Sequence, residues 1–326
     1  MEIDIPTTVK IASYAGAGFC IGLGAIGAAL GEGYTAGLAN QGLSQKPEQS
    51  GDIMKNMLVG QAVAESAAIF ALVIAILLIF MDMSAPNLLT AAALLGAGLS
   101  MGFGAIGSGI GSGFPGGQAC LGLARQPSMS ARLTTNMLIG SAVCQTPAIF
   151  SMVIALILMF GMDLGSSPVS PTWAALLGAG LSTGLAAIGS GAGGGLAAGA
   201  SCEGIARQPE SLGQVTTTML VGQAVSQTPA IFGLLVSFIL IFKGFPETAS
   251  VVTPMALLGA GLSMGFGGLG PGIGNGLAAQ GATKWVSRNM AAGGLLTRTM
   301  LVAQAVSQST AIYAMVVSLV LVFVVI

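Results

Sequence analysis

The stretch MLVGQAVAESAAIFALVIAILLIFM, residues 57–81, decides the architecture of this chain. It is long enough to cross a bilayer as a helix, since about 20 apolar residues suffice. One acidic residue, Glu65, interrupts it. A carboxylate at membrane depth is costly, which makes it a candidate functional group by default. The stretch therefore predicts a transmembrane helix that carries an ionisable group for a functional purpose.

The composition of the whole chain agrees with that prediction. Its 326 residues are 54% hydrophobic and 6% charged, whereas soluble domains carry about 25% charged residues. The net charge of −1 offers no basic surface for nucleic acid. The chain has no histidine, and no nucleotide-binding motif or nucleophile–base pair is evident. We therefore expect an integral membrane protein that is not catalytic by itself and needs no cofactor.

The segment around Glu65 recurs three times, at intervals of about 81 residues, with Gln145, Gln227 and Gln308 at the acidic position. Each repeat has two apolar segments that are long enough to span. Backbone polar groups must be satisfied internally in hydrocarbon, so we predict an all-α fold of eight transmembrane helices in four tandem hairpins. The expected hairpins are residues 1–83, 84–163, 164–245 and 246–326. The expected helices are 10–40, 53–81, 89–122, 131–161, 172–204, 213–242, 254–285 and 293–325.

Positive charge gathers at the hairpin tips, which are predicted at residues 43–52, 125–131, 207–213 and 287–293. Eight of the ten Lys and Arg residues lie there: Lys46, Lys55, Arg125, Arg132, Arg207, Lys284, Arg288 and Arg298. The remaining two, Lys10 and Lys243, lie toward the opposite ends of their helices. The positive-inside rule then predicts cytoplasmic tips and both termini outside. Because each repeat has two spans, all four hairpins should point the same way.

Glycines recur at every second position in the first helix of the later hairpins, for example at Gly107, Gly109, Gly111 and Gly113. The first hairpin has a weaker version of the pattern, with Ala25, Gly27, Ala29, Gly31 and Gly33. At 100° per residue, this spacing puts small residues on two flanks of one helix. Each flank permits close approach of a neighbouring helix. The pattern predicts an inner row of first helices with the bulkier second helices outside. Ordinary bundle packing is the alternative, and a phosphate loop is disfavoured because no strand precedes the glycines.

Taken together, these motifs make the chain resemble the c subunit, or proteolipid, of rotary ATPases of the F type, with four hairpins fused. The resemblance rests on the glycine helix, the carboxylate of the second helix and the tip motifs Arg125-Gln126-Pro127 and Arg207-Gln208-Pro209. It implies a ring of copies of this chain that turns in the membrane against a stator a subunit. It also implies that the tips contact the central stalk and that lipid surrounds the ring, in a bacterial inner membrane.

The resemblance also implies an ion-binding site of the sodium type. Sodium-carrying relatives use a polar residue of the first helix, here Glu32, with an acid and a hydroxyl of the second, here Glu65 and Ser66. The carbonyl of Val63 would add another oxygen ligand, and oxygen is what hard cations prefer. From the residues alone, two facing acids cannot both ionise easily at low dielectric, so one should hold a proton. The alternative is an interhelical hydrogen bond between Glu32 and protonated Glu65 with no ion.

In sodium-binding relatives, the carbonyl and the hydroxyl come from a neighbouring hairpin, and this chain offers two candidates. The second repeat offers Val143 and Thr146. The fourth repeat of an adjacent copy offers Val306 and Ser309, and the sequence does not choose between the two. The family places an aromatic hydroxyl near the site. Repeat one has Phe70 at that position and so lacks the hydroxyl, whereas repeat four has Tyr313.

One acid per four hairpins predicts one transported Na⁺ or H⁺ per chain, because an amide cannot carry alternating charge. One charge crossing 100 mV yields only ~2.3 kcal/mol. A rotor of about three such chains should therefore favour ATP-driven pumping over synthesis. Two alternatives remain: a proton-specific rotor, and a static membrane pore or scaffold that needs no acid at residue 65.

Overall fold

The structure, a computed structural model, describes residues 4–81, 87–162, 164 and 167–324. Within these residues it contains eight long helices and no strand, which confirms the all-α prediction. Each helix is long and apolar enough to cross a membrane. They form hairpin 1 (α1 Ile5–Gln45, α2 Ser50–Phe80), hairpin 2 (α3 Leu88–Arg125, α4 Ser130–Phe160), hairpin 3 (α5 Val169–Arg207, α6 Leu212–Phe242) and hairpin 4 (α7 Val252–Arg288, α8 Gly293–Phe323).

Two of the first helices, α1 and α3, begin after a residue whose side chain caps the helix. Asp4 caps α1 by accepting the backbone N–H of Thr7 at 3.3 Å. Asn87 caps α3 in the same way through Thr90, at 2.8 Å. A polar oxygen at this position satisfies one of the free N–H groups of the first turn. The first helices therefore extend some residues beyond the expected spans at both ends.

A short 3₁₀ turn joins the two helices of every hairpin. In three tips this turn begins at a proline, at Pro47, Pro127 and Pro209. Proline fits the first position of a helical turn because its φ is already fixed and no N–H is needed there. The connection expected at residues 82–86 lies outside the described residues, as does the start of the one expected at 165–171.

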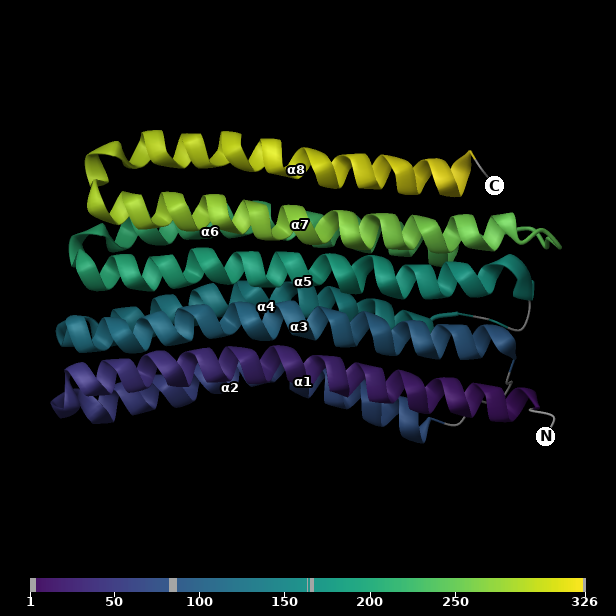
Figure 1. Cartoon of the computed structure of the whole chain (residues 1–326), viewed down its shortest axis with the longest axis horizontal. Helices are drawn as coiled ribbons and strands as arrows, with labels where there is room; N and C mark the ends of the chain where they lie inside the picture. Colours follow the sequence, from purple (N-terminus) through teal and green to yellow (C-terminus); the bar gives the residue numbers. More distant parts are fainter. Residues whose placement is uncertain (1–3, 82–86, 163, 165–166, 325–326) are drawn as a thin grey trace.

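The hairpins stand side by side with all tips at one end, as Figure 1 shows. α1, α3, α5 and α7 follow one another in a row and pack tightly together. The second helices pack mainly against this row and touch one another far less. The row of first helices thus forms the core of the chain, as the glycine pattern predicts.

The glycine flanks explain how the first helices come so close. Gly107 and Gly111 of α3 face α5, where an added Cβ would collide with backbone oxygens of Ile188 and Gly191. Gly109 faces the opposite way, and its Cβ would lie 2.5 Å from the carbonyl carbon of Gly27 in α1. Real Cβ atoms do not approach backbone this closely. The two-flank prediction is therefore confirmed.

Candidate ion-binding site

Glu32 and Glu65 lie on the edge of hairpin 1 that faces away from hairpin 2. The residue before each carboxylate packs inward: Gly31 and Ala64 are buried, and a Cβ on Gly31 would lie 3.2 Å from that of Ala64. One residue further on, Glu32 is half-buried and Glu65 is exposed. The two carboxylates are thus on an edge that no other described part of the chain covers.

The equivalent position in hairpin 2 is filled by an amide that reaches back to hairpin 1. Gln145 Nε2 donates to the carbonyl oxygen of Val63 at 2.9 Å and to Ser112 Oγ at 2.7 Å. Ser112 is the counterpart of Glu32. The Val63 carbonyl is therefore directed toward hairpin 2, and Ser66 adds a second hydrogen bond to it at 2.6 Å.

The next two interfaces between hairpins have related contacts, and in the third the donor is on the first helix. Gln227 Nε2 donates to the carbonyl of Val143 at 3.4 Å. Asn275 Nδ2 donates to the carbonyl of Val225 at 3.4 Å and to Gln308 Oε1 at 2.7 Å. In every internal interface, an amide nitrogen of the following hairpin meets the valine carbonyl of the preceding one.

Two prolines make carbonyls available for this contact. Pro147 and Pro229 lie inside α4 and α6, four residues after Val143 and Val225. A proline in a helix removes the N–H that would bond to the carbonyl four residues earlier. The freed carbonyls accept the amides of hairpins 3 and 4 instead.

A second row of amides lies one helical turn before the acidic position, and the sequence reasoning missed it. Gln223 Nε2 donates to Gly140 of hairpin 2 at 2.9 Å and to Gly194 of its own hairpin at 3.1 Å. Gln304 donates in the same way to Gly222 at 3.0 Å and Asn275 at 2.9 Å. Within the described part of the chain Gln61, the counterpart in hairpin 1, makes only the contact inside its own hairpin, to the carbonyl of Glu32 at 3.4 Å. The recurrence of Gln at residues 61, 223 and 304 was the available signal.

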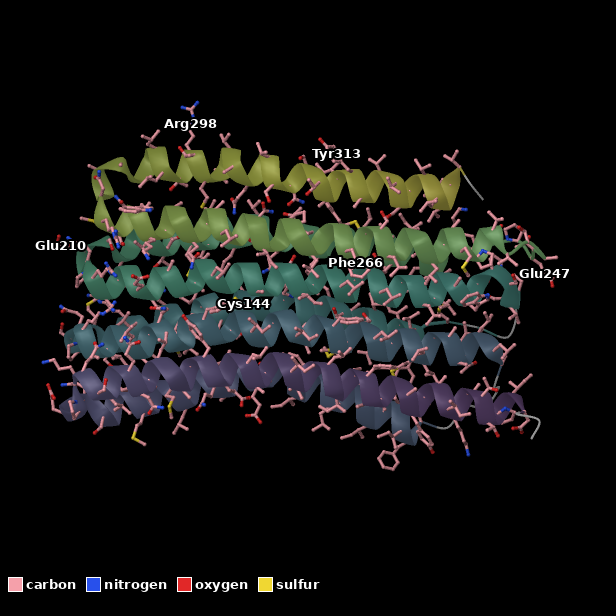
Figure 2. All side chains as sticks on the ribbon, viewed as in Figure 1. Cys144, Glu210, Glu247, Phe266, Arg298 and Tyr313 are labelled. Atoms are coloured by element: carbon pink, nitrogen blue, oxygen red, sulfur yellow. The ribbon has the colours of Figure 1, made fainter. Side chains whose placement is uncertain are left out.

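The opposite edge of the chain, on α8, carries the counterpart of the valine whose carbonyl accepts the amide in each internal interface. Val306 is 69% exposed, and its carbonyl accepts from Ser309 Oγ at 2.7 Å. Tyr313, further along the same helix, is 66% exposed. Figure 2 shows Tyr313 pointing away from the other hairpins.

Each hairpin also matches a known family. Residues 15–78, 95–158, 177–240 and 258–321 each match the model of the ATP synthase C subunits. The chain belongs to the ATP synthase C-subunit family. Its members are membrane rotor components that form rings and are not catalytic by themselves. This chain is therefore a fused c subunit, a multi-pass integral membrane protein.

Individual relatives of this fused rotor protein belong to different branches. It is 34% identical to the A-type ATP synthase K subunit of Methanocaldococcus jannaschii over 195 residues, 60% of this chain and 81% of that protein. It is 54% identical to the ATP synthase c subunit of Petrotoga mobilis over 67 residues, 21% of this chain and 70% of that protein. The match to the second ATP synthase c subunit of Cereibacter sphaeroides is 45% over 75 residues, 23% of this chain and 90% of that protein.

The tips of the fused c subunit present the predicted stalk-contact residues at one end. Arg125 and Arg207 are the last residues of α3 and α5 and are exposed. Gln126, Pro127, Gln208 and Pro209 follow them and are half-buried. Arg207 also bonds to Glu203 at 2.7 Å, and Lys284 reaches the same carboxylate at 3.7 Å. These ion pairs thus connect α5 and α7 near the tips of hairpins 3 and 4.

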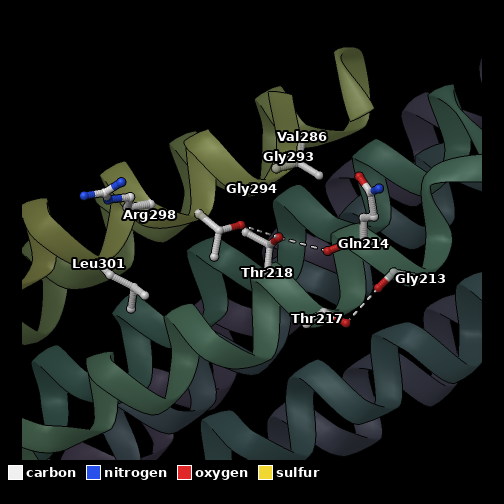
Figure 3. Close-up of a pocket in the computed structure, with 10 residues that line it drawn as sticks. Gly213, Gln214, Thr217, Thr218, Val286, Gly293, Gly294, Arg298 and Leu301 are labelled. Atoms are coloured by element: carbon white, nitrogen blue, oxygen red, sulfur yellow. Dashed lines mark hydrogen bonds between the residues drawn. The ribbon is translucent and has the colours of Figure 1, made fainter. Parts of the chain in front are cut away.

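A pocket of about 600 Å³ opens between α6 and α8 near the tips (Figure 3). Its lining includes Gln214, Thr217, Thr218 and Arg298. Thr218 and Thr297 hydrogen-bond across it at 3.2 Å. Neither Glu32 nor Glu65 lines this pocket. It is therefore separate from the candidate ion-binding site.

Proposed function

We propose that this rotor protein carries one Na⁺ per chain on Glu65, with Glu32 as a second carboxylate of the same site. The observation that carries the proposal is the amide at each internal interface. There the valine carbonyl of the preceding hairpin meets a side-chain N–H donor. In hairpin 1, carboxylates take the positions of these amides: Glu65 that of Gln145 and Gln227, and Glu32 that of Asn275. An ionised carboxylate has no proton to donate, so a cation or a proton must stand between it and a facing carbonyl.

The missing half of the site comes from a second copy of the chain. Because each hairpin reaches back to the one before it, Glu65 faces hairpin 4 of the neighbouring copy. The carbonyl of Val306 and the hydroxyl of Ser309 of that copy then face the two carboxylates from the other side of the site. Val143 and Val63 are engaged inside the chain by Gln227 and Gln145, which favours Val306 and Ser309 over Val143 and Thr146.

Tyr313 supports this choice of neighbour. The equivalent residues of the other hairpins are Phe70, Phe150 and Phe232. The only tyrosine of the four thus lies on the edge that faces Glu65 of the next copy. Its hydroxyl can donate a hydrogen bond to the carboxylate of Glu65, which Phe70 cannot do because it has no hydroxyl. Gln61 fits in the same way, since its remaining Nε2 proton would point toward the carbonyl of Ala303, the counterpart of Gly140 and Gly222.

Sodium is favoured over the proton because the chain and its neighbouring copy would both offer oxygen groups to the site. Two carboxylates, one hydroxyl and one carbonyl make a hard-cation set, whereas a proton carrier needs only the acid. One charge per four hairpins yields ~2.3 kcal/mol per 100 mV, so ATP-driven pumping is the favoured direction. By the positive-inside rule, the charged tips face the cytoplasm. There they contact the central stalk. A stator a subunit delivers the ion to Glu65.

Carbodiimide labelling of the purified ring tests the proposal, because these reagents attack a protonated carboxyl. Sodium is titrated at fixed pH, and the modified residue is read by mass spectrometry. We expect labelling at Glu65 that sodium suppresses. Labelling that responds to pH but not to sodium makes this a proton rotor. No labelling at Glu65 contradicts the carrier role and favours a static pore or scaffold.

A further inference from the structure

The interface between two copies differs from the three interfaces inside a copy, and this inference rests on the proposed function. The outer flank of α1 carries glycines at positions that face the preceding hairpin elsewhere. No described atom lies within 4 Å of a Cβ built on Gly18, Gly22 or Gly33. The counterparts of Gly18 and Gly33, Gly98 and Gly113, lie against the backbone of α1. The flank therefore continues the internal pattern, and a second copy of the same chain is the partner that fits it.

Ala29 breaks this pattern at the level of the carboxylates. Its counterparts are Gly109, Gly191 and Gly272. At each of these, an added Cβ would lie 2.5 Å from a backbone carbonyl carbon of the preceding hairpin. Ala29 is exposed in the single chain and already has that Cβ. At the internal spacing it would collide with the backbone of α7 in the neighbouring copy.

Ala303 breaks the pattern from the other side of the same interface. Its counterparts Gly60, Gly140 and Gly222 face the following hairpin. A Cβ on Gly140 would lie 2.6 Å from the Cβ of an alanine there, and a Cβ on Gly222 would collide with the equivalent alanine. Ala303 is exposed on α8, and the matching residue of the next copy is Ala36. Two independent positions thus prevent the copies from adopting the internal spacing.

A threonine–asparagine hydrogen bond joins the hairpins at the first two internal interfaces, and the interface between copies cannot form it. Thr134 donates to Asn56 Oδ1 at 2.9 Å, and Thr216 donates to Asn136 Oδ1 at 2.8 Å. Hairpin 1 has Met54 at the threonine position. Methionine cannot donate a hydrogen bond, so this position adds no hydrogen bond across the interface between copies.

We propose that the interface between copies is wider than the internal interfaces at the level of Glu32 and Glu65. The bound cation then contacts the carboxylates directly and reaches Val306 and Ser309 of the next copy through water. Restoring ordinary carbon contacts of ~3.5 Å at Ala29 requires about 1 Å of extra separation. Direct ligation of a hard cation needs oxygens at roughly 2.3–2.6 Å, as for Ca²⁺. A gap lined by polar groups is where a bridging water is stable.

The first test is a cryo-EM structure of the assembled wild-type ring. We expect the spacing between α7 of one copy and α1 of the next to exceed the α1–α3, α3–α5 and α5–α7 spacings near Glu32. Four equal spacings overturn the inference. This measurement does not depend on ion binding, so it can fail while the proposed carrier role of Glu65 stands.

The second test is the ring of the double variant Ala29→Gly, Ala303→Gly. Closing the gap brings Val306 and Ser309 within direct reach of the cation. The sodium concentration that half-protects Glu65 from carbodiimide should fall by about threefold or more, a small change in binding free energy. Ala25→Gly on the same flank is the matched control and should leave it unchanged, because Ala105 and Ala187 tolerate the Cβ there. An unchanged or raised value in the double variant overturns the water-mediated contact.

Discussion

Gln145 Nε2 lies 2.9 Å from the carbonyl oxygen of Val63 and 2.7 Å from Ser112 Oγ, across the interface between hairpins 1 and 2. The amide group stands where a cation would stand if residue 145 were an acid. It supplies two hydrogen-bond donors, and it cannot change its charge because it has none. In the internal interfaces, an amide side chain therefore always occupies the place of the ion. This explains how a rotor can include hairpins that carry no ion.

Replacing this amide by an acid should create a second carrier. In Gln145→Glu, the carboxylate meets the Val63 carbonyl without a donor, so a cation or proton must fill the gap. We expect a second residue labelled by carbodiimide, at position 145, and protected by sodium. Gln308→Glu is the control, because Asn275 already donates to position 308 and to the carbonyl of Val225. Equal sodium protection at positions 145 and 308 would contradict the role assigned to the Val63 carbonyl.

Neutralising Glu65 should uncouple the rotor. Glu65→Gln places an amide in the fourth interface and leaves no ionisable group at the site except Glu32. Sodium-stimulated ATP hydrolysis by the whole complex should be lost, while the ring still assembles. Glu210→Gln, at an exposed tip position, is the control and should retain sodium stimulation. Retained stimulation in Glu65→Gln would favour the static pore or scaffold.

The hydroxyl of Tyr313 should strengthen the site of the neighbouring copy. Tyr313→Phe removes one hydrogen bond to a carboxylate, worth about 1.5 kcal/mol or more. The half-protecting sodium concentration should rise by about tenfold. The matched variant Phe232→Tyr adds a hydroxyl at an interface without an acid, and we expect no change. If both variants behave like the wild type, Tyr313 does not serve Glu65.

Two glycine substitutions should separate folding from assembly. Gly111→Ala drives a Cβ into the backbone oxygen of Gly191, and such overpacking costs typically about 1–3 kcal/mol. It should lower the thermal stability of the chain itself. Gly18→Ala, about four helical turns before Glu32, meets no described atom within 4 Å in the single chain, so it should spare the fold and impair ring assembly instead. Native gels and thermal unfolding in detergent distinguish the two outcomes.

Much of the fold could be predicted from the sequence because its signals are local. Length and hydropathy define the eight helices, and the glycine period defines two flanks of each first helix. The helices α1 and α3 begin earlier than expected, since Asp4 and Asn87 cap them ahead of the apolar segments.

The partner of Glu65 could not be predicted, for a physical reason. A valine carbonyl and a neighbouring hydroxyl occur in every repeat, at Val63, Val143, Val225 and Val306. The sequence shows which groups are available but not which edge of a helix each one faces. That direction appears only when Gln145 is seen to contact Val63. The roles of Pro147 and Gln61 depend on the same geometry.

A comparison of Ser309→Ala with Ser66→Ala tests most directly whether the ion site of Glu65 is shared between two copies of the chain. Both variants remove one serine hydroxyl that bonds to the valine three residues before it. Sodium protection of Glu65 from carbodiimide is titrated in each assembled ring. We predict that Ser309→Ala raises the half-protecting sodium concentration by about tenfold and that Ser66→Ala leaves it unchanged. The opposite result, a shift in Ser66→Ala but not in Ser309→Ala, would contradict a site shared between copies of this chain.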